Sequence, residues 1–84
     1  MTYLLFGVKL QLHRELLRKT QAEFAQRIGI DKKVYENLEQ GQNEPRSGVI
    51  LRVQERLGIT LAPEDMIIEL TGAERDKVLG RARG

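Results

Sequence analysis

The sequence predicts a single all-α domain, folded as a compact bundle of about five short helices. Apolar residues recur at helical spacing in several segments, and most of these segments are bounded by a capping residue or a glycine. No long strand pattern and no internal repeat is visible. A chain of 84 residues is too short for a second core, so residues 1–84 are assigned to one domain with its core at about 8–59.

The first helix is expected over residues 8–19, where four leucines form one broad apolar face: Leu10, Leu12, Leu16 and Leu17. The preceding residues 3–6 are apolar without a clear period. A short strand, an extra helical turn and a surface for a partner all fit that segment.

Two short helices joined by a tight glycine turn are expected next. Thr20 and Glu23 have the spacing of a capping box, so a helix begins after Thr20, and Gly29 is suited to end it in the left-handed conformation. Asp31 is a suitable cap for the following helix, which stops at Gly41. The predicted buried residues are Phe24, Ala25, Ile28, Tyr35 and Leu38, with Ile30 and Tyr35 forming a hydrophobic staple.

A fourth helix is expected between a Ser47 cap and Gly58, with Val49, Ile50, Val53 and Leu57 at helical spacing. Residues 60–84 are assigned to one or two C-terminal helices and a basic tail that contains Arg81 and Arg83. Pro63 marks the first turn of one helix, together with Glu64 and Asp65. Its expected buried residues are Met66, Ile67 and Leu70. Thr71 and Glu74 repeat the capping-box spacing and open a last helix through Leu79.

The composition excludes several function classes. Cysteine is absent and His13 is the only histidine, so neither a disulfide framework nor a zinc site is expected. The longest apolar run, residues 4–6, is far too short to span a membrane, and no signal peptide is visible, which fits a cytoplasmic protein without a membrane partner. No set of nucleophile and base and no glycine-rich phosphate loop is present, so we expect neither an enzyme nor a cofactor.

The positive charge of the chain is concentrated in its first half. Residues 1–43 hold seven Lys or Arg against five Asp or Glu, whereas residues 44–84 hold seven of each. Between Arg14 and Lys33 there are six basic residues against three acidic ones. A local patch of this kind attracts phosphate although the net charge is only +2.

The two short helices at 21–28 and 32–40 match helix-turn-helix geometry, in which the second helix enters the major groove of DNA. Residues 21–41 resemble, without a gap, the DNA-binding segment of phage repressor and Cro proteins, the lambda-repressor-like or XRE family. The resemblance rests on Gln21, the central Ala25, the turn glycine Gly29, the Leu-Glu-x-Gly close of the second helix and the proline four residues beyond Gly41. It extends over about residues 12–59.

This resemblance implies a role for each exposed position of the recognition helix. Lys32, Lys33 and Asn37 lie where the family reads base edges, and these side chains suit guanine and adenine acceptors and donors. Val34 either touches a thymine methyl group or packs inside the protein. Glu36 either accepts from a cytosine amine or points into solvent, and we favour solvent.

The family's contacts to the DNA backbone map onto the start of the first short helix and the loop after the second. Gln21 lies where the family contacts phosphate, and the phosphate candidates are Lys19, Thr20, Gln21, Arg14, Gln40, Gln42, Asn43 and Arg46. Some members have an ion pair that corresponds to Arg14 and Glu39. Lys19 departs from the family pattern, which has an apolar residue there, and this leaves the register of Arg14 open.

The resemblance implies a sequence-specific DNA-binding transcription regulator, a repressor that binds its operator on double-stranded DNA as a homodimer. The alternative is an antitoxin or a restriction-modification controller, whose main partner is another protein such as a toxin. Two apolar segments either form the dimer interface or complete the monomer core: Tyr3, Leu4, Leu5 and Phe6 at one end, and Met66, Ile67, Leu70 and Leu79 at the other.

Overall fold

The computed structural model describes residues 2–41, 45–62, 64 and 67–83. It contains β1 (Thr2–Leu4), α1 (Leu5–Leu16), α2 (Gln21–Ile28), α3 (Lys32–Gln40), α4 (Ser47–Leu57), β2 (Glu69–Thr71) and α5 (Gly72–Arg83). The predicted helical bundle is confirmed, because five helices account for most of the described chain. The two-stranded sheet is an addition to the all-α class that the sequence predicted.

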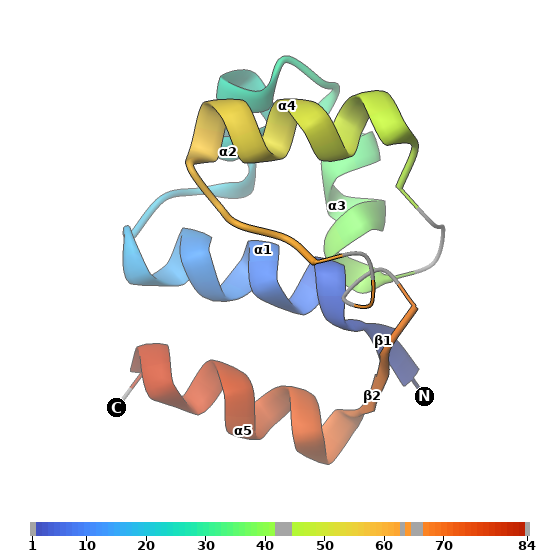
Figure 1. The fold of residues 1–84 in the computed structure, drawn as a ribbon. Helices are drawn as coiled ribbons and strands as arrows, with labels where there is room; N and C mark the ends of the chain where they lie inside the picture. Colours follow the sequence, from blue (N-terminus) through green and yellow to red (C-terminus); the bar gives the residue numbers. More distant parts are fainter. Residues whose placement is uncertain (1, 42–44, 63, 65–66, 84) are drawn as a thin grey trace.

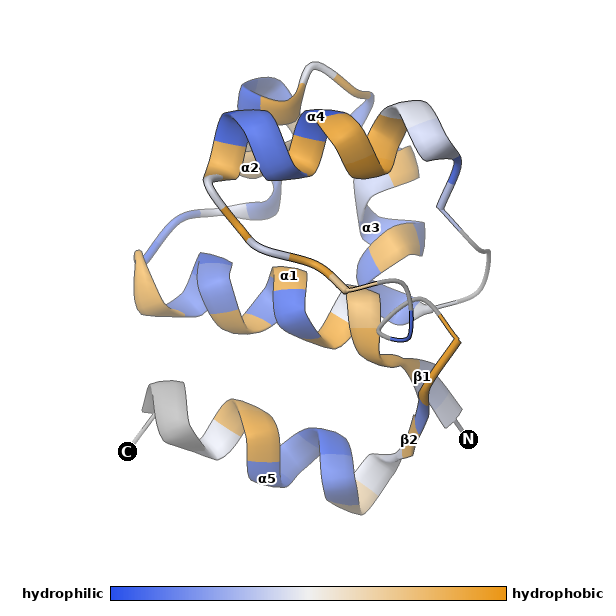
Figure 2. Cartoon of the chain, in the orientation of Figure 1, coloured by the Kyte–Doolittle hydropathy of each residue, from blue (hydrophilic) through white to orange (hydrophobic). Residues whose placement is uncertain are grey.

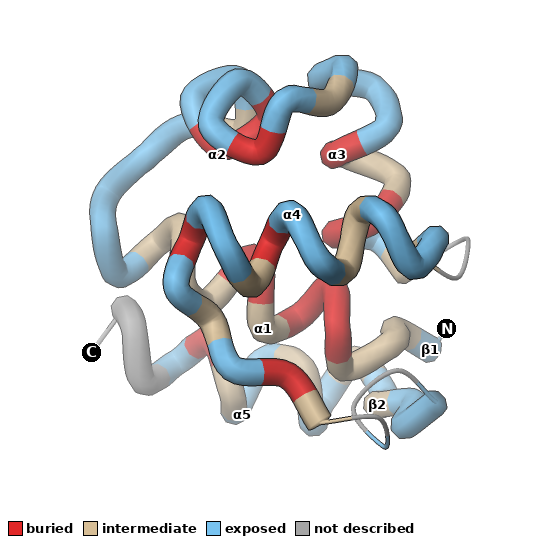
Figure 3. Tube along the Cα trace, turned by 45° about the horizontal axis from the view of Figure 1, so that its top comes forward, coloured by how far each residue is buried: buried red, intermediate tan, exposed pale blue. Residues whose placement is uncertain are grey.

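Helix α1 lies at the centre of the molecule and packs against α5 on one side and against α3 on the other (Figure 1). The main core is formed by apolar side chains from α1 to α4, and Figure 3 shows buried stretches in each of these helices. Phe24 and Tyr35 meet edge to face there, with ring centroids 6.2 Å apart. In Figure 2, apolar and hydrophilic residues alternate along α4, as expected of a helix with one buried side.

The capping residues and glycines predicted the bounds of α2 and α3 correctly. The Thr20 hydroxyl accepts from the Glu23 amide at 3.1 Å, and the Glu23 carboxylate accepts from the Thr20 amide at 2.9 Å. Gly29 and Gly41 end the two helices with φ of 86° and 68°, in the left-handed region that favours glycine. Asp31 is the N-cap of α3, although its side chain forms no capping hydrogen bond with the described residues.

Helix α1 begins and ends three residues earlier than predicted. It covers Leu5–Leu16, and Arg18 then takes a left-handed φ of 54°, which turns the chain toward the cap of α2. As a result, Leu16 and Leu17 are 56% and 47% exposed, so their predicted place in the buried face is wrong. The open question about residues 3–6 is also answered, because the strand Thr2–Leu4 leads directly into α1.

Helix α4 ends at Gly58 as predicted, but its cap is not Ser47. Arg46 is the N-cap, with an extended backbone at φ −74° and ψ 151°, and Ser47 is already the first helical residue. The loop therefore ends one residue earlier than the sequence suggested.

The predicted helix that starts at Pro63 is wrong in its described part. Residues 69–71 form β2, which pairs antiparallel with β1 so that Tyr3 lies opposite Leu70. Ile67 is 73% exposed instead of buried. A strand partner at the far end of the chain overrides the local helical signal. Pro63, Asp65 and Met66 lie outside the described residues.

The last predicted helix is confirmed and extends beyond Leu79. Thr71 and Glu74 form the expected capping box, with hydrogen bonds of 3.0 and 3.2 Å, and α5 continues to Arg83. The side chains of the predicted basic tail, Arg81 and Arg83, lie outside the described part. In the part of the chain that the structure describes, every helix is too short or too polar to cross a membrane.

Candidate nucleic-acid interface

Helix α3 has one buried and one exposed face. Tyr35, Leu38 and Glu39 are buried and hold the helix against the rest of the domain. The other face presents the predicted base readers: Lys32 and Lys33 are exposed, Val34 is 45% exposed, and Asn37 and Glu36 are half-buried. At 45% exposure, Val34 lies at the surface of α3, where a thymine methyl group could reach it.

Glu36 lies at the surface of α3 and pairs with Lys32 one turn earlier. The Nζ atom of Lys32 lies 3.6 Å from Oε1 of Glu36. Exposed pairs at this spacing contribute only about 0.3–0.5 kcal/mol, so Lys32 can exchange Glu36 for a base or a phosphate at low cost. Lys33 is exposed and forms no ion pair with the described residues.

The start of α2 presents a polar edge with a fixed backbone. The Thr20 cap uses the amides of Thr20 and Glu23, which leaves the first-turn amides of Gln21 and Ala22 outside the cap. Hydrogen bonds from the Thr20 amide and hydroxyl, and to a smaller degree the charge of Lys19, lower the pKa of Glu23 below its ordinary value of 4.5. The Nζ atom of Lys19 is 3.8 Å from the Glu23 carboxylate.

The ion pair between Arg14 and Glu39 is present. Nε of Arg14 donates to Oε2 of Glu39 at 2.7 Å, and Nη2 donates to Oε1 at 3.1 Å, which is a bidentate pair. Nη1 of Arg14 also donates to the Lys19 carbonyl oxygen at 3.1 Å. The unusual Lys19 therefore does not displace Arg14, and the hydrogen bonds to Glu39 raise the pKa of the guanidinium further.

Two further side chains lie next to Glu39: Gln21 from α2 and Tyr35 one turn earlier in α3. Nε2 of Gln21 donates to Oε1 of Glu39 at 3.3 Å. The Tyr35 ring is fully buried, and burial together with the neighbouring Glu39 carboxylate raises the pKa of its hydroxyl. Glu39, which is 4% exposed, thus joins α1, α2 and α3 at a single point behind the exposed face of α3.

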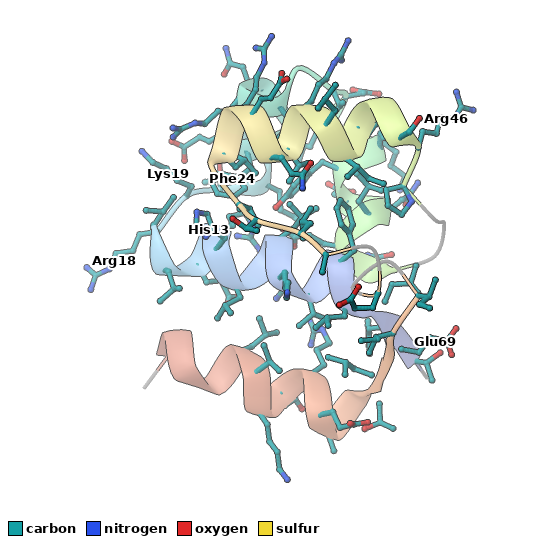
Figure 4. The ribbon with its side chains drawn as sticks, viewed as in Figure 1. His13, Arg18, Lys19, Phe24, Arg46 and Glu69 are labelled. Carbon is teal, nitrogen blue, oxygen red and sulfur yellow. The ribbon has the colours of Figure 1, made fainter. Side chains whose placement is uncertain are left out.

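The candidates in the loop after α3 are only partly described. Gln40 and Arg46 are exposed at the two ends of this loop, whereas Gln42 and Asn43 lie outside the described residues. Figure 4 shows Lys19 and Arg46 on opposite sides of the molecule, each projecting away from the body. Cationic side chains therefore lie at both margins of the helix-turn-helix.

Comparison with known families supports this geometry. The profile of the helix-turn-helix family matches residues 10–63, well over half of the chain, from α1 to beyond the end of α4. Searches of the curated proteins and of the solved structures gave no match to this chain. With α2 and α3 arranged around a glycine turn inside the matched segment, the chain belongs to the lambda-repressor-like (XRE) helix-turn-helix family of DNA-binding regulators.

Proposed function

We propose that this protein is a sequence-specific transcription regulator, acting as a repressor, which binds operator DNA as a homodimer with α3 in the major groove. The observation that carries this proposal is the two-sided character of α3. Its buried side is fixed to α1 and α2 through Glu39, and its exposed side presents two lysines, an asparagine and a valine. A rigidly held helix with polar groups of this kind suits direct reading of base edges.

The exposed side chains of α3 suit different bases. Lys32 and Lys33 suit the O6 and N7 acceptors of guanine, and Asn37 suits the N6 and N7 atoms of adenine. Val34 offers an apolar surface to a thymine methyl group. We therefore expect a half-site that contains guanine as well as an A·T pair.

Phosphate contacts are proposed on both sides of α3. At one margin, the start of α2 offers the Thr20 hydroxyl and the backbone amide of Gln21, which lies outside the cap, with Lys19 beside them. At the other margin we propose Arg46 and the loop residues Gln40, Gln42 and Asn43. Arg14 is 16% exposed and three of its donors are engaged, so we assign it to the positioning of Glu39.

A dimer is proposed because one module reads only a few base pairs, and tight binding needs two half-sites about one helical turn apart. The apolar residues at the chain ends are mostly used within the monomer, since Phe6 and Leu79 are buried and Leu70 is half-buried. Ile67 and Ile68 stay 73% and 40% exposed, and this turn is the surface that we propose for a second copy.

The proposal is tested by selection from random duplex DNA, followed by binding measurements on the enriched site and on random DNA. We expect Lys32→Ala and Lys33→Ala to weaken the enriched site by about 1–3 kcal/mol and random DNA less, whereas Gln21→Ala weakens both similarly. Lys77→Ala on α5 removes a charge from an exposed position outside the proposed interface and serves as the control.

If Lys32→Ala, Lys33→Ala and Gln21→Ala each lose the same affinity on the enriched site and on random DNA, α3 does not read bases through these lysines. Enrichment of no motif would contradict sequence-specific binding altogether. Affinity should also fall with salt, with a log-log slope of about −0.9 for each phosphate neutralised. A salt-independent interaction would instead favour a protein as the main partner.

A further inference from the structure

The C-terminal end of the recognition helix rests directly on the backbone of β1 and of the first turn of α1. A Cβ atom at Gly7 would overlap the carbonyl oxygen of Leu38 and lie 2.9 Å from that of Glu39. A Cβ atom at Gly41 would lie 2.5 Å from the Leu4 nitrogen. Only glycine allows backbones to approach this closely, so the backbone of residues 3–7 forms a seat for the end of α3.

This seat is held from the other side by the C-terminal unit, which we define as β2 and α5 (Glu69–Arg83). Strand β1 pairs with β2 along its whole length, and the Leu5 amide donates to the Ile68 carbonyl oxygen at 2.8 Å. Figure 1 shows the sheet beside the end of α3 and α5 on the far side of α1. The C-terminal unit lies outside the segment that matches the family profile, residues 10–63.

Arg75 connects α5 to β1 and to α1, the two elements that carry the seat. Its guanidinium carbon lies 4.8 Å from the centre of the Tyr3 ring in β1, within cation–π range. Its Nη2 atom donates to Oε1 of Gln11 at 2.8 Å, and Gln11 is a buried residue of α1 that in turn donates to Glu15. The main chain of Tyr3 is the surface that a Cβ atom at Gly41 would meet at 3.3 Å.

We infer that Arg75 is a positioning residue for DNA reading, which fixes β1 and through it the recognition helix. The inference rests on the proposed function. A helix of nine residues has little stability of its own, so the orientation of α3 is set by the elements it packs against. Glu39 attaches α3 to α1 and α2, and the seat contacts the C-terminal end of α3. A displacement of β1 therefore tilts the base-reading face of α3.

The experiment compares Arg75→Met with Lys77→Met in binding to the selected DNA site, at a temperature where both variants are folded by circular dichroism. Each variant removes one positive charge from α5, but Lys77 is exposed and serves as the matched control. We expect Arg75→Met to lower affinity for the selected site on the order of tenfold, and Lys77→Met to leave it unchanged. The salt slope should stay at the wild-type value for Arg75→Met, because no phosphate contact is lost.

Gly7→Ala and Gly80→Ala test the seat independently of charge. Alanine at Gly7 meets the α3 backbone, whereas a Cβ atom at Gly80 in α5 has nothing within 4 Å. We expect Gly7→Ala to change the base preference found by selection and Gly80→Ala to preserve it. Should Gly7→Ala fail to fold, the Arg75 comparison decides the question.

Amide chemical shifts separate a failure of this inference from a failure of the proposed function. In Arg75→Met we expect the amides of Leu38, Glu39 and Gly41 to shift, whether or not DNA is present. Unchanged shifts there, or wild-type affinity of folded Arg75→Met for the selected site, would overturn the coupling. A salt slope reduced by about 0.9 would also overturn it, because Arg75 would then contact phosphate itself. If the wild-type protein selects no site, the proposed function fails, and the shifts alone decide the coupling.

Discussion

At the scale of single residues, Glu39 is the point on which the candidate interface depends. It is 4% exposed and accepts from both Arg14 and Gln21. Glu39→Leu leaves the largely buried guanidinium of Arg14 without its partner, so it should lower the free energy of unfolding by roughly 2–3 kcal/mol. The loss is smaller than for a fully buried ion pair because the Arg14 side chain is 16% exposed. Urea denaturation of Glu39→Leu, Arg14→Met and the double variant measures the coupling. Purely additive losses would show that the two side chains do not stabilise each other.

Arg18 is a second residue with a testable energetic consequence. Its φ of 54° is unfavourable for a residue with a Cβ atom, and glycine adopts this conformation freely. We expect Arg18→Gly to raise the free energy of unfolding by about 1 kcal/mol. Lys19→Gly is the control, because its backbone is not left-handed. Glycine there relieves no strain, adds freedom to the unfolded chain and removes the exposed ion pair with Glu23, so it should lower stability. Lower stability of Arg18→Gly in urea denaturation would contradict the argument.

At the scale of elements, the two capping boxes make helix formation dependent on pH. Hydrogen bonds from Thr20 and Thr71 lower the pKa of Glu23 and Glu74 below the ordinary value of 4.5. A lowered pKa in the folded state stabilises the protein above the unfolded-state pKa, and this stabilisation is lost as the pH falls through the folded-state value. Glu23→Ala and Glu74→Ala should therefore be less stable than wild type at pH 7, and the difference should shrink below pH 4.5.

Urea denaturation from pH 7 to pH 3 measures this difference. Glu55→Ala removes an exposed glutamate of α4 outside any capping box and should cost less stability at pH 7. A difference between wild type and the cap variants that stayed constant across the whole pH range would show that the carboxylates are not responsible.

The helices whose bounds were predicted correctly from the sequence are those with capping residues or glycines at their ends. Helices α2 and α3 are fixed by caps and glycines within a few residues of their ends, and the same holds for the start of α5. Strand β2 was missed because its partner is β1, at the opposite end of the chain, and no local pattern reports such a pairing. The hydrogen bond from Gln21 to Glu39 was missed because it joins side chains of two different helices, which no local pattern reports. The exposed positions of α3, in contrast, followed from the family resemblance.

At the scale of the whole molecule, α1 lies between two layers, of which one is matched by the family profile and the other is not. The layer on one side is the family module of α2, α3 and α4, and the layer on the other is α5, joined to the module's recognition helix through the β1–β2 sheet. Because Phe6, Val8 and Leu79 are buried in the monomer, the chain does not need a second copy to complete its core. Self-association therefore depends on what stays exposed beside the sheet.

Ile67 is the residue on which the proposed dimer can be tested. It is 73% exposed in the turn before β2, next to Ile68, and a two-fold interface would bring the same turn of both copies together. Ile67→Glu places a charge at that contact and should weaken self-association at least tenfold in sedimentation equilibrium, because burying an isoleucine side chain contributes about 1.5–3 kcal/mol. Leu51→Glu changes a 55% exposed residue on α4, away from the sheet, and should leave self-association unchanged. If Leu51→Glu abolishes the dimer and Ile67→Glu retains it, the dimer interface lies on α4. The two copies would then have to reach their two half-sites while paired through α4.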